Sequence, residues 1–200
     1  MPNMHLNYIA NALVPSSSGH TIPMLDPSDG QPFDAIQRSN AADIDAAVGA
    51  ARQCQDAVWS KLSATERGRL LMRLSAKVAE NAEELALIEQ RDCGKPTRQA
   101  RADTLALVRY FEFYAGACDK LHGDTIPYQD GYTVMTWYEP HGVTGHIIPW
   151  NYPMQIFGRS VGGALAAGNV CVVKPSEDAC LSLLRIAELA AEVGFPAGAI

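Results

Sequence analysis

The sequence has no long hydrophobic run, and no stretch approaches the roughly 18 consecutive apolar residues that a membrane-spanning helix requires. Residues 1–19 also lack the basic start and apolar core of a secretory signal. Acidic residues outnumber basic ones, and the formal net charge of −6 disfavours nucleic acid and anionic membranes as partners. We therefore expect a cytoplasmic protein that binds neither nucleic acid nor membrane.

Cysteines are few and irregularly spaced. The five of them form no C-x-x-C pair, and no histidine stands beside one at metal-ligand spacing. This pattern predicts reduced thiols, and neither a disulfide scaffold nor a metal site is expected. Hydrophobic residues make up 48% of the 200 positions, which is enough to build a packed core in one or two domains.

The first 123 residues are predicted to be mainly helical after an irregular start. Asp, Pro and Gly dominate a turn at residues 25–32, and short extended pieces are expected on either side of it. Downstream, apolar residues recur with helical spacing. This spacing predicts four helices, over residues 41–59, 65–81, 81–94 and 98–120.

Caps and core positions follow from the same pattern. Ser39 or Asn40 is the predicted N-cap of the first helix. Thr65 is the predicted N-cap of the second, without a capping box, because Gly68 occupies the position of the expected Glu or Gln. The candidate core residues are Leu70, Leu71, Leu74, Val78, Leu85 and Ile88, and in the fourth helix Leu105, Val108, Tyr110, Phe111, Phe113 and Tyr114.

Residues 124–141 differ in character from the helices before them. Residues 133–138 are rich in β-formers, and Asp130-Gly131 is a hairpin turn signal. The segment is predicted to be a two-stranded excursion between two parts of the fold.

From Gly142 the pattern becomes β-α-β-α. Strands are predicted over 143–148 and 170–173, and helices over 154–167 and 180–193. Short apolar strands of this kind fit a parallel sheet covered on both faces. The expected fold class is α/β, with N-terminal helices (residues 1–123) packed on a Rossmann-like sheet (residues 142–200).

This half lacks two features of a complete doubly wound sheet. No G-x-G-x-x-G follows either strand, so a standard phosphate loop is absent, and Gly162 and Gly163 are expected to allow close helix–sheet packing instead. Only two strands are predicted, whereas such a sheet needs more to bury its faces. The chain is therefore expected to be truncated.

Polar side chains follow both predicted strands, at the edge where ligands bind in open α/β sheets. Asn151 follows the first strand, and its amide could donate to a developing negative charge. By spacing alone, a plain N-cap for the next helix is the favoured interpretation. Lys174 and Glu177 follow the second strand, where they could meet ribose or phosphate, or form a solvated loop pair.

These loops resemble motifs of the aldehyde dehydrogenase superfamily in residue identity, order and spacing, and the resemblance covers about residues 20–200. The matching segments are GHIIPWNYP at 145–153, ALAAGN at 164–169 and VKPSE at 173–177, with DP at 26–27, WS at 59–60, TER at 65–67, DCGKP at 92–96, YAG at 114–116 and GDTIP at 123–127 upstream.

The resemblance implies roles for individual residues. Asn151 would donate its side-chain amide to the oxygen of a thiohemiacetal, as the one catalytic residue in this chain. Residues 124–141 would be an oligomerisation arm that pairs subunits into a homodimer or homotetramer. The cofactor-binding residues would be Ile147, Ile148, Pro149, Trp150, Asn151, Lys174, Pro175, Ser176 and Glu177. Tyr152, Met154, Gln155 and Phe157 are candidates for the wall of the aldehyde tunnel.

The family mechanism uses a cysteine thiolate that attacks the aldehyde, hydride transfer to NAD(P), and a glutamate that activates water. None of the five cysteines lies in the nucleophile's motif, so the nucleophile is expected outside this chain, as are the glutamate and the phosphate loop. Glu177 near a ribose 2′ position would favour NAD, with NADP possible. The alternatives are a CoA-acylating or reductive family member, and a truncated, non-catalytic chain that binds nucleotide or a partner.

Overall fold

The computed structural model describes residues 3–200; residues 1 and 2 of the predicted helical part lie outside the described residues. The second half folds in the order β8 (Val143–Ile147), α5 (Pro153–Ala166), β9 (Val170–Lys174) and α6 (Leu181–Glu192). The predicted β-α-β-α order is confirmed, and so is the α/β class with a Rossmann-like parallel start.

The two strands run parallel with no shift in register. Val143 lies opposite Val170, and Ile147 lies opposite Lys174. The backbone N–H of Ile148 extends this pairing by donating to the Lys174 carbonyl over 3.0 Å. Because both strands end at the same edge, the loops that follow them start side by side.

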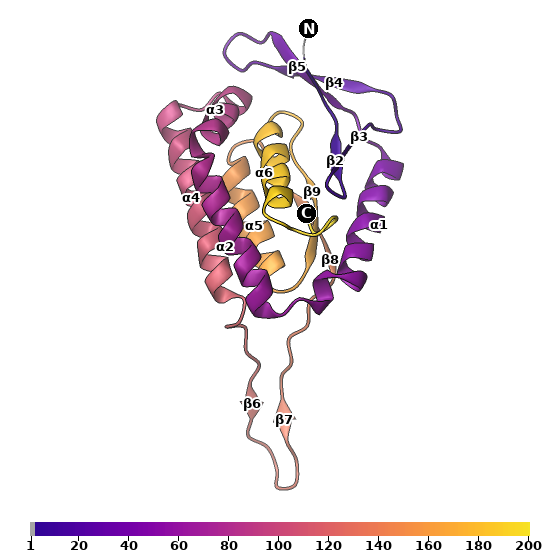
Figure 1. Cartoon of the computed structure of the whole chain (residues 1–200), viewed down its shortest axis with the longest axis vertical. Helices are drawn as coiled ribbons and strands as arrows, with labels where there is room; N and C mark the ends of the chain where they lie inside the picture. The colour runs from indigo at the N-terminus through magenta and orange to yellow at the C-terminus, as the bar shows by residue number, and fades with distance from the viewer. Residues whose placement is uncertain (1–2) are drawn as a thin grey trace.

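Helices enclose this strand pair from two sides (Figure 1). Both α1 and α5 contact β8 and β9, and α1 stands on the opposite side of the strands from α2, α4 and α5. The buried core joins the helices through large apolar side chains such as Leu71, Leu107, Phe111 and Phe157. The helices of the first half are α1 (Ala41–Ala57), α2 (Ala64–Glu80), α3 (Ala82–Cys93) and α4 (Thr97–Ala117), with a 3-10 turn at Trp59–Lys61.

The N-terminal segment forms two small sheets. The extended pieces predicted around the turn are present as β4 (Thr21–Leu25) and β5 (Pro32–Gln37), which pair antiparallel. β1 (Asn3–His5) adds to β5 in parallel, and β2 (Asn7–Ile9) pairs with β3 (Ala12–Val14). The sequence before the turn has no regular hydrophobic period, so these strand pairings are evident only from the structure.

The predicted excursion is a hairpin that projects far from the body (Figure 1). Its strands are β6 (Thr125–Ile126) and β7 (Val134–Met135), paired antiparallel. At its base the Thr136 hydroxyl accepts the Asp124 backbone N–H over 2.6 Å, and the Thr136 N–H donates to the Asp124 carbonyl over 2.9 Å. Hydrogen bonds thus join the two strands of the hairpin at its base, and the hairpin is exposed along its length.

The start of α2 differs from the prediction. Ser63 is the N-cap, since its hydroxyl accepts the Glu66 backbone N–H over 3.2 Å and the Glu66 carboxylate accepts the Ser63 N–H over 2.7 Å. The prediction of Thr65 as a cap without a capping box is therefore wrong. The S-x-x-E motif that satisfies both backbone donors begins two residues upstream. The prediction for α1 holds, with Asn40 as its N-cap.

Two predicted core residues of α4 are exposed. Leu105 and Phe113 retain 62% and 57% of their accessible surface. The buried stripe of α4 consists of Ala100, Asp103, Thr104, Leu107 and Phe111. Three of these five residues are small or polar, so a search for large apolar side chains passes over much of the stripe.

The glycines of α5 allow close approach of a helix rather than of the sheet. A Cβ on Gly158 would lie 2.8 Å from Leu107 Cδ1, and one on Gly162 would lie 2.8 Å from Tyr114 Cδ2. Leu107 and Tyr114 both belong to α4, so the prediction of helix–sheet packing at Gly162 and Gly163 is wrong. Across residues 3–200, no helix is both long and apolar enough to cross a bilayer.

Candidate functional site

Asn151 lies exposed in the loop between β8 and α5. The N-cap position of α5 is Tyr152, whose own side chain makes no capping hydrogen bond. Among the described residues, the Asn151 side chain has no hydrogen-bond partner. The alternative of a plain N-cap is therefore not what the structure shows, and the amide is free to meet a ligand.

Exposed apolar side chains flank Asn151 in the sequence, at the end of β8. Ile147 is 83% exposed and Trp150 58% exposed, which is unusual for side chains of this size. Tyr152, on the other side, is 40% exposed. An apolar rim around one polar group is typical of small-molecule sites.

Some predicted binding residues point away from this rim. Ile148 is only 2% exposed, so its side chain belongs to the core and only its main chain can face a ligand. Of the four tunnel candidates, Met154 and Phe157 are fully buried against α4. They are excluded as a tunnel wall because Phe157 packs edge-on against Phe111 at 6.2 Å and the Met154 sulfur accepts the Thr104 hydroxyl.

Lys174 and Glu177 form an ion pair in the loop after β9. The Lys174 Nζ lies 2.9 Å from Glu177 Oε2, and both side chains are more than half exposed. The hydrogen bond from Lys174 lowers the pKa of Glu177, and the charge of Arg38 lowers it further. Glu177 is therefore a carboxylate at neutral pH, open to solvent.

A groove of about 620 Å³ runs along this second loop. Its volume falls in the range of roughly 300–1,000 Å³ that is usual for small-molecule pockets. Its lining includes Lys174, Pro175, Ser176 and Glu177. Residues 147–151 do not line the groove; they lie beside it, one strand away.

The opposite wall of the groove comes from the N-terminal segment, which the sequence did not identify. The polar residues on this wall include Asn7, Arg38 and Asn40. Arg38 is close enough to Glu177 to affect its pKa. More than a hundred residues separate these groups from Lys174, and no local motif connects them, so only the fold shows that they share a groove.

A second feature that the sequence missed lies beneath the Asn151 loop. The Lys95 ammonium bridges two carboxylates, at 2.5 Å from Glu89 Oε1 and 2.7 Å from Asp103 Oδ2. Both carboxylates are fully buried, and Lys95 is 8% exposed. Burial raises the pKa of Glu89. Burial by itself would lower the pKa of Lys95, but the hydrogen bonds to Asp103 and Glu89 outweigh this effect, so the pKa of Lys95 is raised.

The cysteines are free thiols without the surroundings of a nucleophile. Four are buried, and Cys93 is half-buried. Burial raises the pKa of Cys93, and that of Cys171, to about 12. Since the thiolate is the reactive form, neither group is activated for attack at neutral pH. In residues 3–200 there is also no cluster of three or more His, Cys, Asp or Glu that could hold a metal ion.

The arrangement suits a ligand that lies across the edge of the strand pair. One end would meet a lysine, a serine and a carboxylate in the polar groove. The other end would meet a free amide donor within an apolar rim, where a developing oxyanion can be stabilised. The carboxyl edge of parallel strands is where open α/β sheets bind their ligands.

Comparisons of sequence and of structure with known proteins all point to one family. A profile of the aldehyde dehydrogenase family matches residues 13–200. Hydroxyisobutyraldehyde dehydrogenase of Mycolicibacterium austroafricanum is 48% identical over 193 residues, covering 96% of this chain and 38% of that protein.

Solved structures match equally well. A provisionally assigned aldehyde dehydrogenase of Burkholderia cenocepacia is 68% identical, with a TM-score of 0.95, over 97% of this chain and 41% of that one. PnpE of Pseudomonas sp. WBC-3, solved in complex with nicotinamide adenine dinucleotide, is 42% identical, with a TM-score of 0.93, over 98% of this chain and 40% of that one. The chain thus spans about two-fifths of the length of the proteins it matches.

Proposed function

The chain belongs to the aldehyde dehydrogenase family, and from that premise we propose that the complete protein oxidises an aldehyde to a carboxylic acid with NAD⁺. The observation that supports this most directly is the free Asn151 amide, held beside the Lys174–Glu177 groove by the parallel register of β8 and β9. A relative of this fold was solved with nicotinamide adenine dinucleotide bound.

Asn151 is proposed to act on the substrate oxygen. When a nucleophile adds to the aldehyde carbon, negative charge develops on that oxygen, and a donor already in place stabilises it. The exposed rim of Ile147, Trp150 and Tyr152 would exclude water from the reacting carbon. The bound cofactor supplies the acceptor for the hydride that leaves this carbon.

Lys174, Pro175, Ser176 and Glu177 are proposed to hold the adenosine end of NAD in the groove. Glu177 is ionised and exposed, so it can accept hydrogen bonds from ribose hydroxyls and would repel a 2′-phosphate. This favours NAD over NADP. Lys174 lies within ion-pair distance of Glu177 and would reduce the discrimination, so NADP stays possible.

The thiolate nucleophile and the glutamate that activates water are proposed to come from other parts of the complete protein. Within the described residues, every thiol is unsuited to the task, because the four buried ones are inaccessible and Cys93 has a raised pKa. Residues 1–123 and 142–200 would then be the cofactor-binding part of the enzyme.

Residues 124–141 are proposed to pair copies of the protein into a homodimer or homotetramer. The hairpin exposes Ile126, Tyr128, Tyr132, Met135, Trp137 and Tyr138, and exposed apolar side chains in one extended element are typical of an interface. A cytoplasmic location is proposed from the five free cysteines.

The test is an assay of the complete protein with an aldehyde panel, in the presence of NAD⁺ or NADP⁺, with and without coenzyme A. We expect NAD reduction with release of the free acid and no need for coenzyme A. A product that forms only as an acyl-coenzyme A would assign a CoA-acylating enzyme instead.

Replacement of Asn151 tests its proposed role. We expect Asn151→Ala to lower kcat by about 10²–10³, as loss of one oxyanion donor does in other enzymes. Binding of NAD, followed by fluorescence titration, should change little because the groove is unaltered. A variant that retains wild-type kcat would exclude the amide from the reaction.

A further inference from the structure

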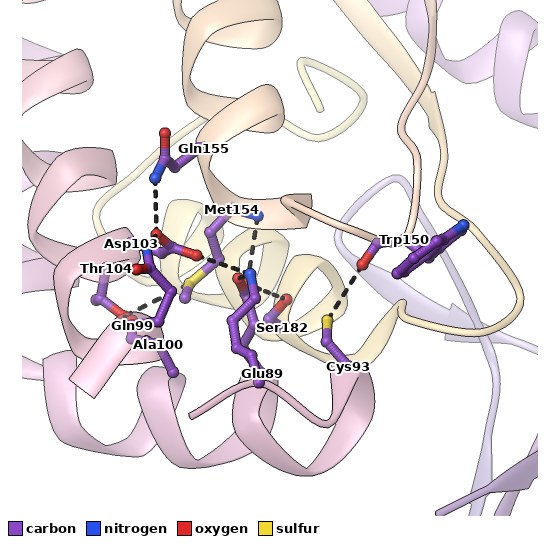
Figure 2. A network of polar contacts seen from close by, with 11 residues as sticks. Glu89, Cys93, Gln99, Ala100, Asp103, Thr104, Trp150, Met154, Gln155 and Ser182 are labelled. Atoms are coloured by element: carbon purple, nitrogen blue, oxygen red, sulfur yellow. Dashed lines mark hydrogen bonds and ion pairs between the residues drawn. The ribbon is translucent and has the colours of Figure 1, made fainter. Parts of the chain in front are cut away.

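Residues 89–103 form one block of the chain that contacts Trp150, which precedes Asn151, and Met154 and Gln155, which follow it (Figure 2). Before Asn151, the Cys93 thiol donates to the Trp150 carbonyl over 3.3 Å. Directly after it, the Lys95 ammonium lies 4.8 Å from the centre of the Tyr152 ring.

The same block holds the first turn of α5. The Met154 backbone N–H donates to Glu89 Oε2 over 3.3 Å, and the Gln155 amide donates to Asp103 Oδ1 over 2.7 Å. A carboxylate at this place satisfies a backbone donor that a helix N-terminus leaves unpaired and interacts favourably with the helix dipole. From Trp150 to Gln155, therefore, only Asn151 and Pro153 have no polar or cation–π contact with residues 89–103.

Lys95 links the two carboxylates that hold the first turn of α5. It bridges Glu89 on α3 and Asp103 on α4, and the remaining acceptor positions are taken by Ser182, which donates to Glu89, and Gln99, which donates to Asp103. A buried polar network whose members are all paired is rigid, because any displacement leaves a buried charge without its partner.

Stability alone gives little reason for such a cluster. Well-packed apolar side chains of similar volume commonly stabilise a fold as well as a buried ion pair does. The cluster is, however, well placed to restrict the loop. A catalytic donor has to be held within about 0.5 Å of its productive position by groups that are themselves fixed.

We propose that Glu89, Lys95 and Asp103 form a positioning device that fixes the chain directly after Asn151, while Cys93 holds the Trp150 carbonyl before it, and that the device so presets the Asn151 amide toward the substrate oxygen. This inference rests on the proposed function. Lys95 is its central positioning residue, acting through Tyr152 and through the two carboxylates that hold the first turn of α5.

The first test is independent of activity. Backbone hydrogen exchange of residues 148–156 is measured in the complete protein for wild type and Lys95→Met. We expect at least tenfold faster exchange in the variant, Met154 included. Lys77→Met is the matched control, since it removes the same charge and breaks the ion pair to Glu192 on α6, remote from the loop. Unchanged exchange in Lys95→Met, or the same acceleration in Lys77→Met, would overturn the proposal.

The second test separates positioning from general destabilisation. Lys95→Met should lower kcat by about 10-fold to 100-fold, while the dissociation constant for NAD stays within twofold. In an Asn151→Ala background the same change should lower kcat by less than twofold, because the amide that it positions is gone. An effect of equal size in both backgrounds would show that Lys95 does not act through Asn151.

If Lys95→Met fails to fold, the neutral combination Glu89→Gln, Lys95→Met and Asp103→Asn replaces it, since no buried charge is then left unpaired. Wild-type exchange and wild-type kcat in that variant would overturn the proposal. A wild-type protein that oxidises no aldehyde would defeat the proposed function, whereas the exchange experiment would still decide whether the cluster holds the loop.

Discussion

Asp92 is the residue whose titration affects the fold most directly. Its side chain is 3% exposed, and one oxygen accepts the Leu181 backbone N–H at the start of α6 over 2.7 Å. Within the described residues its other oxygen is buried and has no hydrogen-bond partner. Burial raises the pKa of Asp92 to about 7, from an ordinary value of 3.8.

This shift predicts that stability falls as the pH rises. The folded protein keeps the Asp92 proton to higher pH than the unfolded chain does, so the group favours folding below about pH 4, and this contribution is lost as the pH rises through 7. We expect Asp92→Asn, which cannot ionise, to gain roughly 2–3 kcal/mol relative to wild type between about pH 5 and pH 8. Urea unfolding at the two pH values measures this difference.

Asp130→Asn, at the exposed tip of the hairpin, is the control for that experiment. It removes one carboxyl from an exposed position, so it reports any effect that comes from the loss of net charge alone. A pH-independent difference between Asp92→Asn and wild type would show that Asp92 does not titrate in this range.

At the scale of elements, the contact between α4 and α5 depends on missing side chains. Gly158 allows Leu107 and Tyr110 to approach so closely that a methyl group would lie 2.8 Å and 3.1 Å from their nearest atoms. The first turn of α5 follows the Asn151 loop. The packing of these two helices therefore sets where the loop ends.

We expect Gly158→Ala to lower the free energy of unfolding by about 1–3 kcal/mol, because overpacking between the two helices outweighs the gain in helix propensity. Gly49→Ala in α1 is a matched control, since nothing lies within 4 Å of its added Cβ. There the same change should stabilise by about 0.5–1 kcal/mol. Chemical denaturation of both variants gives the comparison, and an equal response would refute the close-packing interpretation.

The elements were predictable from the sequence where the signal is local. Helical spacing, the Gly94 C-cap and the Asp130-Gly131 turn identify where helices and hairpin lie. Local predictions were wrong at Thr65, because Ser63 begins the capping motif, and at Leu105 and Phe113, because the buried stripe of α4 includes small and polar residues.

The cluster beneath Asn151 was not predictable in the same way. Glu89 and Asp103 are charged, and charged residues on a helix ordinarily indicate its solvent face. Only the fold shows that they occupy core positions and share one lysine, 65 and 52 residues away from the α5 residues they bind, Met154 and Gln155. The Arg38 wall of the groove was missed for the same reason, because its partners are distant in sequence.

At the scale of the whole molecule, the hairpin is the part that the body does least to stabilise. Its strands have two residues each, and a two-stranded hairpin of that length is marginal alone in water. Trp137 is 78% exposed and Tyr132 68% exposed. These exposed side chains support the proposed role of residues 124–141 in pairing copies of the protein.

We expect Trp137→Lys to reduce the assembled mass of the complete protein toward that of one subunit, since a charge would replace a large apolar contact. Light scattering coupled to size-exclusion chromatography measures it. Leu105→Lys on α4 is the control, because Leu105 is also exposed, at 62%, but lies outside the arm. An unchanged mass for Trp137→Lys would place the interface elsewhere.

The bridge made by Lys95 also bears on the order in which parts of the chain fold during synthesis. Glu89, Lys95 and Asp103 lie within one helix–loop–helix hairpin, so both carboxylates can acquire their counter-ion before α5 and α6 leave the ribosome. Met154, Gln155 and Ser182 add their hydrogen bonds to the two carboxylates only once these later segments are in place. Completion of the cluster then becomes a late step of folding, which follows only after the Asn151 loop has been made and docked.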